Sequence, residues 1–220
     1  MILKRSWPAW GATKIRGGLL FGLVLVLVLG WSRMPRAGAE PTVIATGTGG
    51  AVASVDQRAT QVGIDVLRSG GNAVDAAVAT AAALGVTDPF SAGIGGGGFM
   101  VIYQPESGTV VTLDGREEAP ASVTPDLFRD PASPTGDPLP FFPDRISSGL
   151  AVGVPGTLLN WQTALDRYGT WSLAETLQPA IALAADGFPV DATFAQQVAL
   201  NQARFAAFTS TQALYLPNGD

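Results

Sequence analysis

A run of glycines and one arginine carry most of the chemistry that this sequence suggests. The run, Gly93-Ile-Gly-Gly-Gly-Gly-Phe99, fits the pattern G-x-G-x-x-G at residues 93, 95 and 98. That pattern binds dinucleotides when a strand precedes it and a helix follows it. Here a helix is expected before the glycines and a strand after them. We therefore expect that the glycines allow the hairpin backbone to lie close against a packed helix, and that they do not bind a phosphate.

Arg116 lies at the far end of that hairpin, in the segment Asp114-Gly-Arg-Glu-Glu-Ala-Pro120. A guanidinium group is a planar fork that pairs with a carboxylate through two hydrogen bonds, which lysine cannot reproduce. An ordinary surface ion pair with Asp114, Glu117 or Glu118 is the alternative reading of the same residue. The residues alone leave both readings open.

Composition excludes several other kinds of site. The sequence has no histidine and no cysteine, which removes Ser-His-Asp and Cys-His triads, most zinc sites and a disulfide framework. Beyond residue 39 the chain carries seven arginines, no lysine and 18 acids, a net charge of −11. Such a surface repels nucleic acid and anionic lipid. We predict no cofactor, no metal site and no nucleic-acid partner.

The first 39 residues resemble a secretory signal. Basic residues precede an uncharged stretch of 15 residues, 17–31, and Ala37-Gly38-Ala39 matches the small-x-small cleavage pattern. A spanning helix needs about 20 apolar residues. We therefore expect cleavage after residue 39 and a periplasmic or extracellular protein. An uncleaved anchor is the alternative, and residues 17–31 would then be the only contact with a membrane.

The remaining residues, 40–220, predict an α+β domain with strands early and helices packed on them. A long proline- and aspartate-rich excursion, 120–145, interrupts the pattern. The expected strands are Val43–Ala45, Val52–Val55, Phe99–Tyr103 and Thr109–Leu113, and the expected helices are Ala59–Arg68, Ala73–Leu84, Pro125–Phe128, Thr157–Tyr168, Leu173–Ala185 and Phe194–Phe205. Trp161 and Trp171 are expected in the core, and Asn72 and Asp75 at a helix start.

Several segments in order resemble the γ-glutamyltransferase family of N-terminal-nucleophile hydrolases. They include Gly70-Gly-Asn-Ala-Val-Asp-Ala-Ala77, the glycine run, Asp114 to Pro120, Gly153-Val-Pro-Gly-Thr157 and Asp186-Gly-Phe188. The resemblance implies an αββα sandwich, made as a precursor that cuts itself. It also implies that the exposed threonine of the small subunit attacks the γ-glutamyl amide of glutathione or a related compound, with its own amine as the base.

One functional residue transfers from the resemblance: Arg116, which matches the arginine that holds the α-carboxylate of the γ-glutamyl group. Gly115 stands where many relatives carry an aromatic residue, so the wall of that pocket is expected to differ. The resemblance places the nucleophilic threonine, the groups for the α-amine and the oxyanion-hole glycines further along than residue 220. No catalytic residue is therefore assigned in this chain, and residues 40–220 alone are expected to be inactive without the small subunit.

Two alternatives to a γ-glutamyltransferase fragment stay open. A related glutaryl or cephalosporin-type acylase would also bind a carboxylate at Arg116. A secreted, non-catalytic binding remnant would keep the fold without the reaction.

Overall fold

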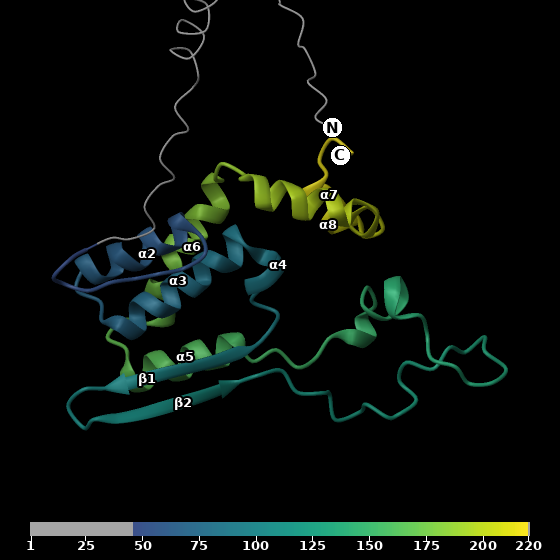
Figure 1. Ribbon diagram of the computed structural model, residues 1–220, viewed down its shortest axis with the longest axis horizontal. Helices are drawn as coiled ribbons and strands as arrows, with labels where there is room; N and C mark the ends of the chain where they lie inside the picture. The colour runs from purple at the N-terminus through teal and green to yellow at the C-terminus, as the bar shows by residue number, and fades with distance from the viewer. Residues whose placement is uncertain (1–45, 220) are drawn as a thin grey trace, which may run out of the picture. The chain divides into compact units, whose positions relative to one another are not determined.

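The computed structural model describes residues 46–219 (Figure 1). The expected strand Val43–Ala45 and the signal or anchor, 1–39, lie outside the described residues. Residues 47–220 form one compact unit. Within the described part of the chain, no helix is both long and apolar enough to cross a membrane. The helices are α2 (Gln57–Arg68), α3 (Ala73–Thr87), α4 (Pro89–Ala92), α5 (Thr157–Tyr168), α6 (Leu173–Asp186), α7 (Ala192–Ala206) and α8 (Thr209–Tyr215).

Helix α3 is the centre of the unit. Its residues are almost all small or apolar, so neighbouring helices pack closely around it, and α2 and α6 make the most extensive contacts. Val78, Ala79 and Ala83 are fully shielded from solvent. One core cluster joins α3 to the hairpin, α5 and α6, and a second joins α3 to α2. Trp161 is buried in the first and Trp171 packs against the second, as expected.

In residues 46–219, two strands, β1 (Gly98–Gln104) and β2 (Thr109–Gly115), form one antiparallel hairpin in which Gly98 pairs with Gly115. Side chains alternate between its two faces. Met100, Ile102 and Leu113 point toward the core, where α5 covers the hairpin, while Phe99 and Val101 are exposed. Helix α5 lies along the hairpin, and its first turn contacts the open end, where Asn160 packs against Gly98 and Gly115.

Two expected elements are not formed, and one helix is present that was not among the predicted elements. Val52–Val55 is not a strand, because no neighbouring strand pairs with it in the described part of the chain. Pro125–Phe128 is a turn, closed by the bond from the amide of Leu127 to the carbonyl of Thr124, and does not propagate as a helix. Residues 209–215 form the helix α8, although we expected no element there.

The other expected elements differ only at their ends, and three short elements that were not expected are present: α4 and the two helical turns η1 (Phe141–Arg145) and η2 (Gly149–Ala151). Helix α3 continues to Thr87 instead of ending at Leu84, and the short helix α4 follows directly. The remaining helices begin and end within two residues of the predicted bounds.

Candidate functional site

Arg116 leaves the end of β2 with its side chain 72% exposed. Its backbone amide donates to Asp114 Oδ1 at 3.0 Å, and its Nε lies 3.4 Å from Glu117 Oε2. The structure thus brings together three of the residues that the sequence singled out. Asp114 orients the backbone of Arg116, and Glu117 lies beside Nε of its guanidinium group. Nη1 and Nη2 form the outer edge of the guanidinium group. Neither has a hydrogen-bond or ion-pair partner among the described residues, so both can bind a ligand.

The glycine run packs directly against the start of α5. The carbonyl of Gly96 accepts hydrogen bonds from the amides of Gly156 and Thr157 at 3.1 and 3.2 Å. A Cβ atom on Gly97 would overlap the carbonyl oxygen of Gly115 and lie 2.8 Å from the amide nitrogen of Glu117. The close approach of two backbones therefore requires glycine at 97. A strand and not a helix follows the run, as expected, so the dinucleotide-binding reading is excluded.

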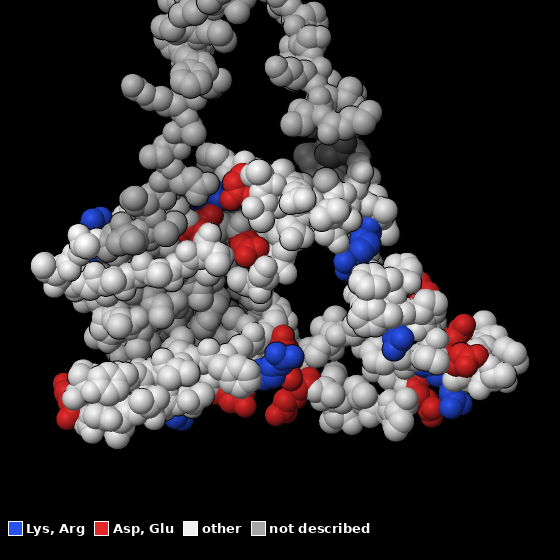
Figure 2. Space-filling model, viewed as in Figure 1, with Lys and Arg blue, Asp and Glu red and all other residues white. Residues whose placement is uncertain are grey.

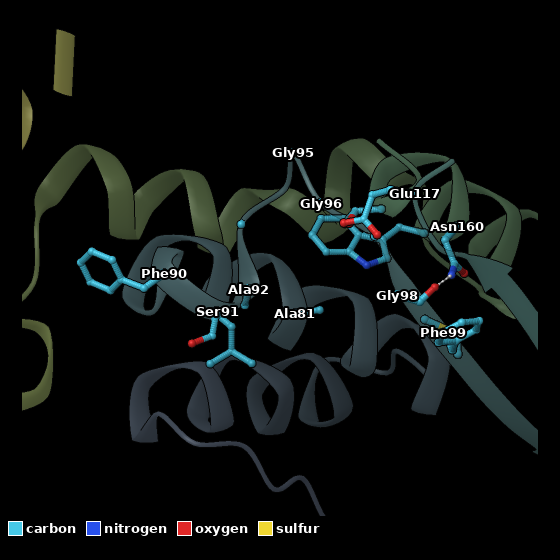
Figure 3. Close-up of a pocket in the computed structure, with 16 residues that line it drawn as sticks. Ala81, Phe90, Ser91, Ala92, Gly95, Gly96, Gly98, Phe99, Glu117 and Asn160 are labelled. Atoms are coloured by element: carbon cyan, nitrogen blue, oxygen red, sulfur yellow. Dashed lines mark hydrogen bonds between the residues drawn. The ribbon is translucent and has the colours of Figure 1, made fainter. Parts of the chain in front are cut away.

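A cavity of about 530 Å³ lies over the glycine run and beside Glu117 (Figure 3). Figure 3 shows the carboxylate of Glu117 beside Gly96, with Phe90 and Ser91 at the opposite end. Few side chains in its lining can hydrogen-bond, and most of the wall is backbone or apolar. Arg116 is not part of the lining, but its ion-pair partner Glu117 is. The lining is Ala81, Leu84, Phe90–Gly93, Gly95–Met100, Glu117, Thr157, Asn160 and Trp161.

Asn160 is a positioning residue that sequence reasoning missed. It is 8% exposed, and its Nδ2 donates to the carbonyl of Gly98 at 3.1 Å. A Cβ atom on Gly115 would lie only 2.6 Å from Asn160 Cβ. The asparagine thus occupies the space that a side chain at position 115 would need, which explains the glycine beside Arg116. Asn160 lies on the buried side of α5 with Trp161 and Ala164, and nothing in the sequence paired it with residue 115.

Asp75 does more than start a helix. It completes the capping box of α3 by accepting from the amide of Asn72 at 2.7 Å. It also accepts from the amide and hydroxyl of Thr170, at 2.9 and 2.6 Å, and from the amide of Trp171 at 3.1 Å. Burial by itself would raise the pKa of this fully buried carboxyl. The hydrogen bonds from Thr170, Asn72 and Trp171 outweigh burial, and they hold the pKa below its ordinary value.

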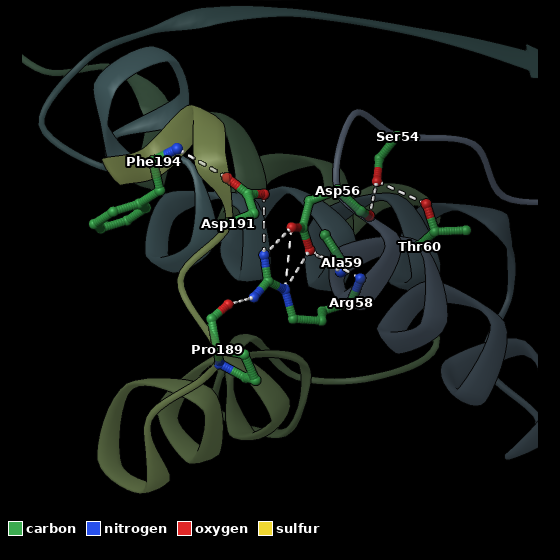
Figure 4. A network of polar contacts seen from close by, with 8 residues as sticks. All are labelled: Ser54, Asp56, Arg58, Ala59, Thr60, Pro189, Asp191 and Phe194. Atoms are coloured by element: carbon green, nitrogen blue, oxygen red, sulfur yellow. Dashed lines mark hydrogen bonds and ion pairs between the residues drawn. The ribbon is translucent and has the colours of Figure 1, made fainter. Parts of the chain in front are cut away.

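A second polar network ties α2 to the segment before α7 (Figure 4). Asp56 caps α2 and forms an ion pair with Arg58 at 2.5 Å. The guanidinium group of Arg58 also donates to the carbonyl of Pro189, and it lies 3.6 Å from Asp191 Oδ2. Burial raises the pKa of Asp56, but the bonds from Arg58 and the backbone lower it by more. We assign this network a structural role, because all its charges face one another.

Charged side chains are spread over the described residues without forming one continuous patch on the face that Figure 2 draws. Figure 2 shows basic side chains scattered on this face, without a continuous strip. Among residues 46–219, no group of three or more aspartate or glutamate side chains is arranged to hold a metal ion. Arg116 and the cavity beside Glu117 therefore remain the candidate site.

Comparison with known proteins places the chain in a family. The gamma-glutamyltranspeptidase family pattern matches residues 59–220. The glutathione hydrolase proenzyme of Bacillus subtilis is 42% identical over 218 residues, covering 99% of this chain and 36% of that protein. The gamma-glutamyltranspeptidase of Helicobacter pylori superposes with a TM-score of 0.71 at 37% identity, over 77% of this chain and 47% of that one.

A cephalosporin acylase from Bacillus halodurans also superposes, with a TM-score of 0.56 at 34% identity, over 68% of this chain and 26% of that one. These likenesses confirm the predicted fold class, an α+β part of an N-terminal-nucleophile hydrolase sandwich. The chain spans about a third of the length of the Bacillus subtilis relative. The chain belongs to the gamma-glutamyltranspeptidase family.

Proposed function

We propose that this chain is the N-terminal part of an enzyme that hydrolyses or transfers the γ-glutamyl group of glutathione and related amides. The family match and the glutathione hydrolase relatives support this proposal. The nucleophilic threonine would lie in the part of those relatives that the chain does not span, and the chain would work with that part as its small-subunit partner. Export through residues 1–39 to a periplasmic or extracellular location belongs to the same proposal.

Arg116 would bind the α-carboxylate of the γ-glutamyl donor. The observation that carries this role is the position of the guanidinium group, exposed at the end of β2 with Nε facing Glu117. Nη1 and Nη2 then present two parallel N–H donors, the geometry that a carboxylate accepts. Glu117 and Asp114 would act as positioning residues, because they hold the arginine and leave its outer edge to the ligand.

An acylase acting on glutaryl or other acyl amides is the second candidate, and the likeness to a cephalosporin acylase favours keeping it. Glutarate and glutamate share the carboxylate that Arg116 would bind and differ only in the α-amine. The groups expected to hold the α-amine lie beyond residue 220, so this comparison needs the complete enzyme. There, binding that requires the amine would indicate a γ-glutamyl enzyme, whereas equal binding of both would indicate an acylase.

Replacing Arg116 tests the binding role directly. Charge-assisted hydrogen bonds contribute about 1.5–3 kcal/mol, so we expect Arg116→Gln to weaken L-glutamate binding by about 10- to 100-fold. Arg116→Lys should recover only part of this loss, because an ammonium group cannot form the paired bonds. Titration of the ¹⁵N-labelled chain with L-glutamate, followed by NMR, measures the affinity lost in Arg116→Gln and the part recovered in Arg116→Lys.

Arg68 provides the matched control. It is 71% exposed and paired with Asp65, so Arg68→Gln removes an equal charge away from the site. Equal losses of L-glutamate affinity in the Arg116 and Arg68 variants would show that the effect comes from net charge and not from a contact with the ligand. Unchanged glutamate binding in Arg116→Gln would contradict the proposed role.

A further inference from the structure

Arg204, on α7, is a half-buried cation without an acidic partner. Its Nε donates to Ser147 Oγ at 3.1 Å, and its Nη1 donates to Asn201 Oδ1 at 2.9 Å. No carboxylate lies within 4.0 Å of its guanidinium group in residues 46–219, although acids outnumber arginines there. Burying a charge among neutral partners costs free energy unless an opposite charge accompanies it. The positive charge of Arg204 is thus left uncompensated.

A cavity of about 370 Å³ lies beside this arginine, between residues 146–152 and the helices α7 and α8. No acidic side chain lines it. Ser147 accepts from Arg204 through its oxygen, which leaves the hydroxyl proton free to donate. Thr211 Oγ1 has no recorded partner among the described residues. The full lining is Ile146–Gly149, Val152, Arg204, Phe205, Phe208 and Thr211.

We propose that this cavity binds a small oxyanion, the carboxylate or phosphate group of a ligand. Three groups would hold it: Nη2 of Arg204 and the hydroxyl groups of Ser147 and Thr211. All three are donors, and an oxyanion accepts several such bonds at once. Ser148 is not counted, because its hydroxyl already donates to the carbonyl of Arg145. Phe205 and Phe208 belong to the apolar part of the cavity wall.

This site is separate from the one at Arg116. The two cavities share no lining residue. The proposal therefore goes beyond the γ-glutamyl reaction and does not depend on it.

NMR titration of the ¹⁵N-labelled chain with sodium phosphate and with sodium acetate, each against sodium chloride at equal ionic strength, tests the proposal. We expect saturable shifts of the amides of residues 147–149 and 211, with a Kd on the order of 1 mM. Arg204→Gln should raise this Kd at least 10-fold. Thr211→Val, which keeps both contacts of Arg204, should raise it by about 3- to 10-fold through the loss of one hydrogen bond.

Arg167→Gln is the matched control, because Arg167 is exposed near the end of α5, away from the cavity, and forms no ion pair in the described residues. It should leave the Kd unchanged. Saturable binding of phosphate alone identifies a phosphate site, and binding of acetate as well identifies a general carboxylate and phosphate site. Shifts no larger than those with chloride, or an equal response of the Arg204 and Arg167 variants, would overturn the proposal.

Discussion

Replacing Asp75 by asparagine should destabilise the fold by about 2–4 kcal/mol, because a buried, hydrogen-bonded carboxylate is lost. The new amide group would place N–H donors against the amide of Asn72 and the hydroxyl of Thr170, which both now donate to this side chain. The substitution would therefore weaken hydrogen bonds in two places, at the start of α3 and in the connection between α5 and α6. Chemical denaturation of both proteins at neutral pH measures the difference.

The effect of Asp75→Asn should also depend on pH. The folded-state pKa of Asp75 lies below its ordinary value of 3.8, so the stability that the carboxylate supplies is fully present above that value. It is lost as the pH falls through the folded-state pKa. The difference between the two proteins should therefore shrink below about pH 4. Asp65→Asn, on the exposed side of α2, should change stability by no more than about 0.5 kcal/mol at either pH. If the Asp75 variant were as stable as this control, the buried carboxylate of Asp75 would not stabilise the fold as described.

Replacing Gly97 by alanine should both destabilise the chain and weaken ligand binding. The added Cβ would overlap the carbonyl oxygen of Gly115, which is backbone and cannot move without shifting β2. Overpacking of this kind costs about 1–3 kcal/mol. Because Gly115 and Glu117 flank Arg116, the shift would also displace the guanidinium group. We expect a lower denaturation midpoint and a weaker affinity for L-glutamate in the same variant.

Gly95, two residues earlier, offers a control within the same run. A Cβ atom there would meet nothing within 4 Å. Gly95→Ala should therefore stay within about 0.5 kcal/mol of the unchanged chain and bind L-glutamate as before. If both alanine variants behaved alike, the packing explanation of the glycine run would be wrong, and a direct contact between the run and the ligand would have to be considered.

The elements with strong local signals were predictable from the sequence. Helix α3 has a capping residue and an unbroken series of small apolar residues, and the hairpin alternates on both sides of a turn. The segment 52–55 has the same β-branched residues as a strand, but a strand exists only where a partner pairs with it. Helix α8 has no polar capping bond to mark its start, so its local signal was weak.

The candidate site was predictable only in part. Arg116 and its neighbours Asp114 and Glu117 are close in sequence, so their contact followed from the chain itself. Asn160 lies 62 residues from its partner Gly98, and Asp75 lies 95 residues from Thr170. Contacts at such separations depend on how α5 packs against the hairpin and α3. Local pattern does not contain that information, and Gly115 predicted only a different pocket wall, not the contact with Asn160.

The most direct test of the proposed function is turnover of glutathione by a chimera. Residues 47–220 would replace the matching segment of the Bacillus subtilis glutathione hydrolase proenzyme. The chimera should hydrolyse glutathione, this chain alone should not, and Arg116→Gln in the chimera should lower kcat/KM by about 100-fold or more. Arg68→Gln should leave kcat/KM unchanged. An active chimera in which Arg116→Gln loses no more activity than Arg68→Gln would contradict the assignment of Arg116 to the γ-glutamyl carboxylate.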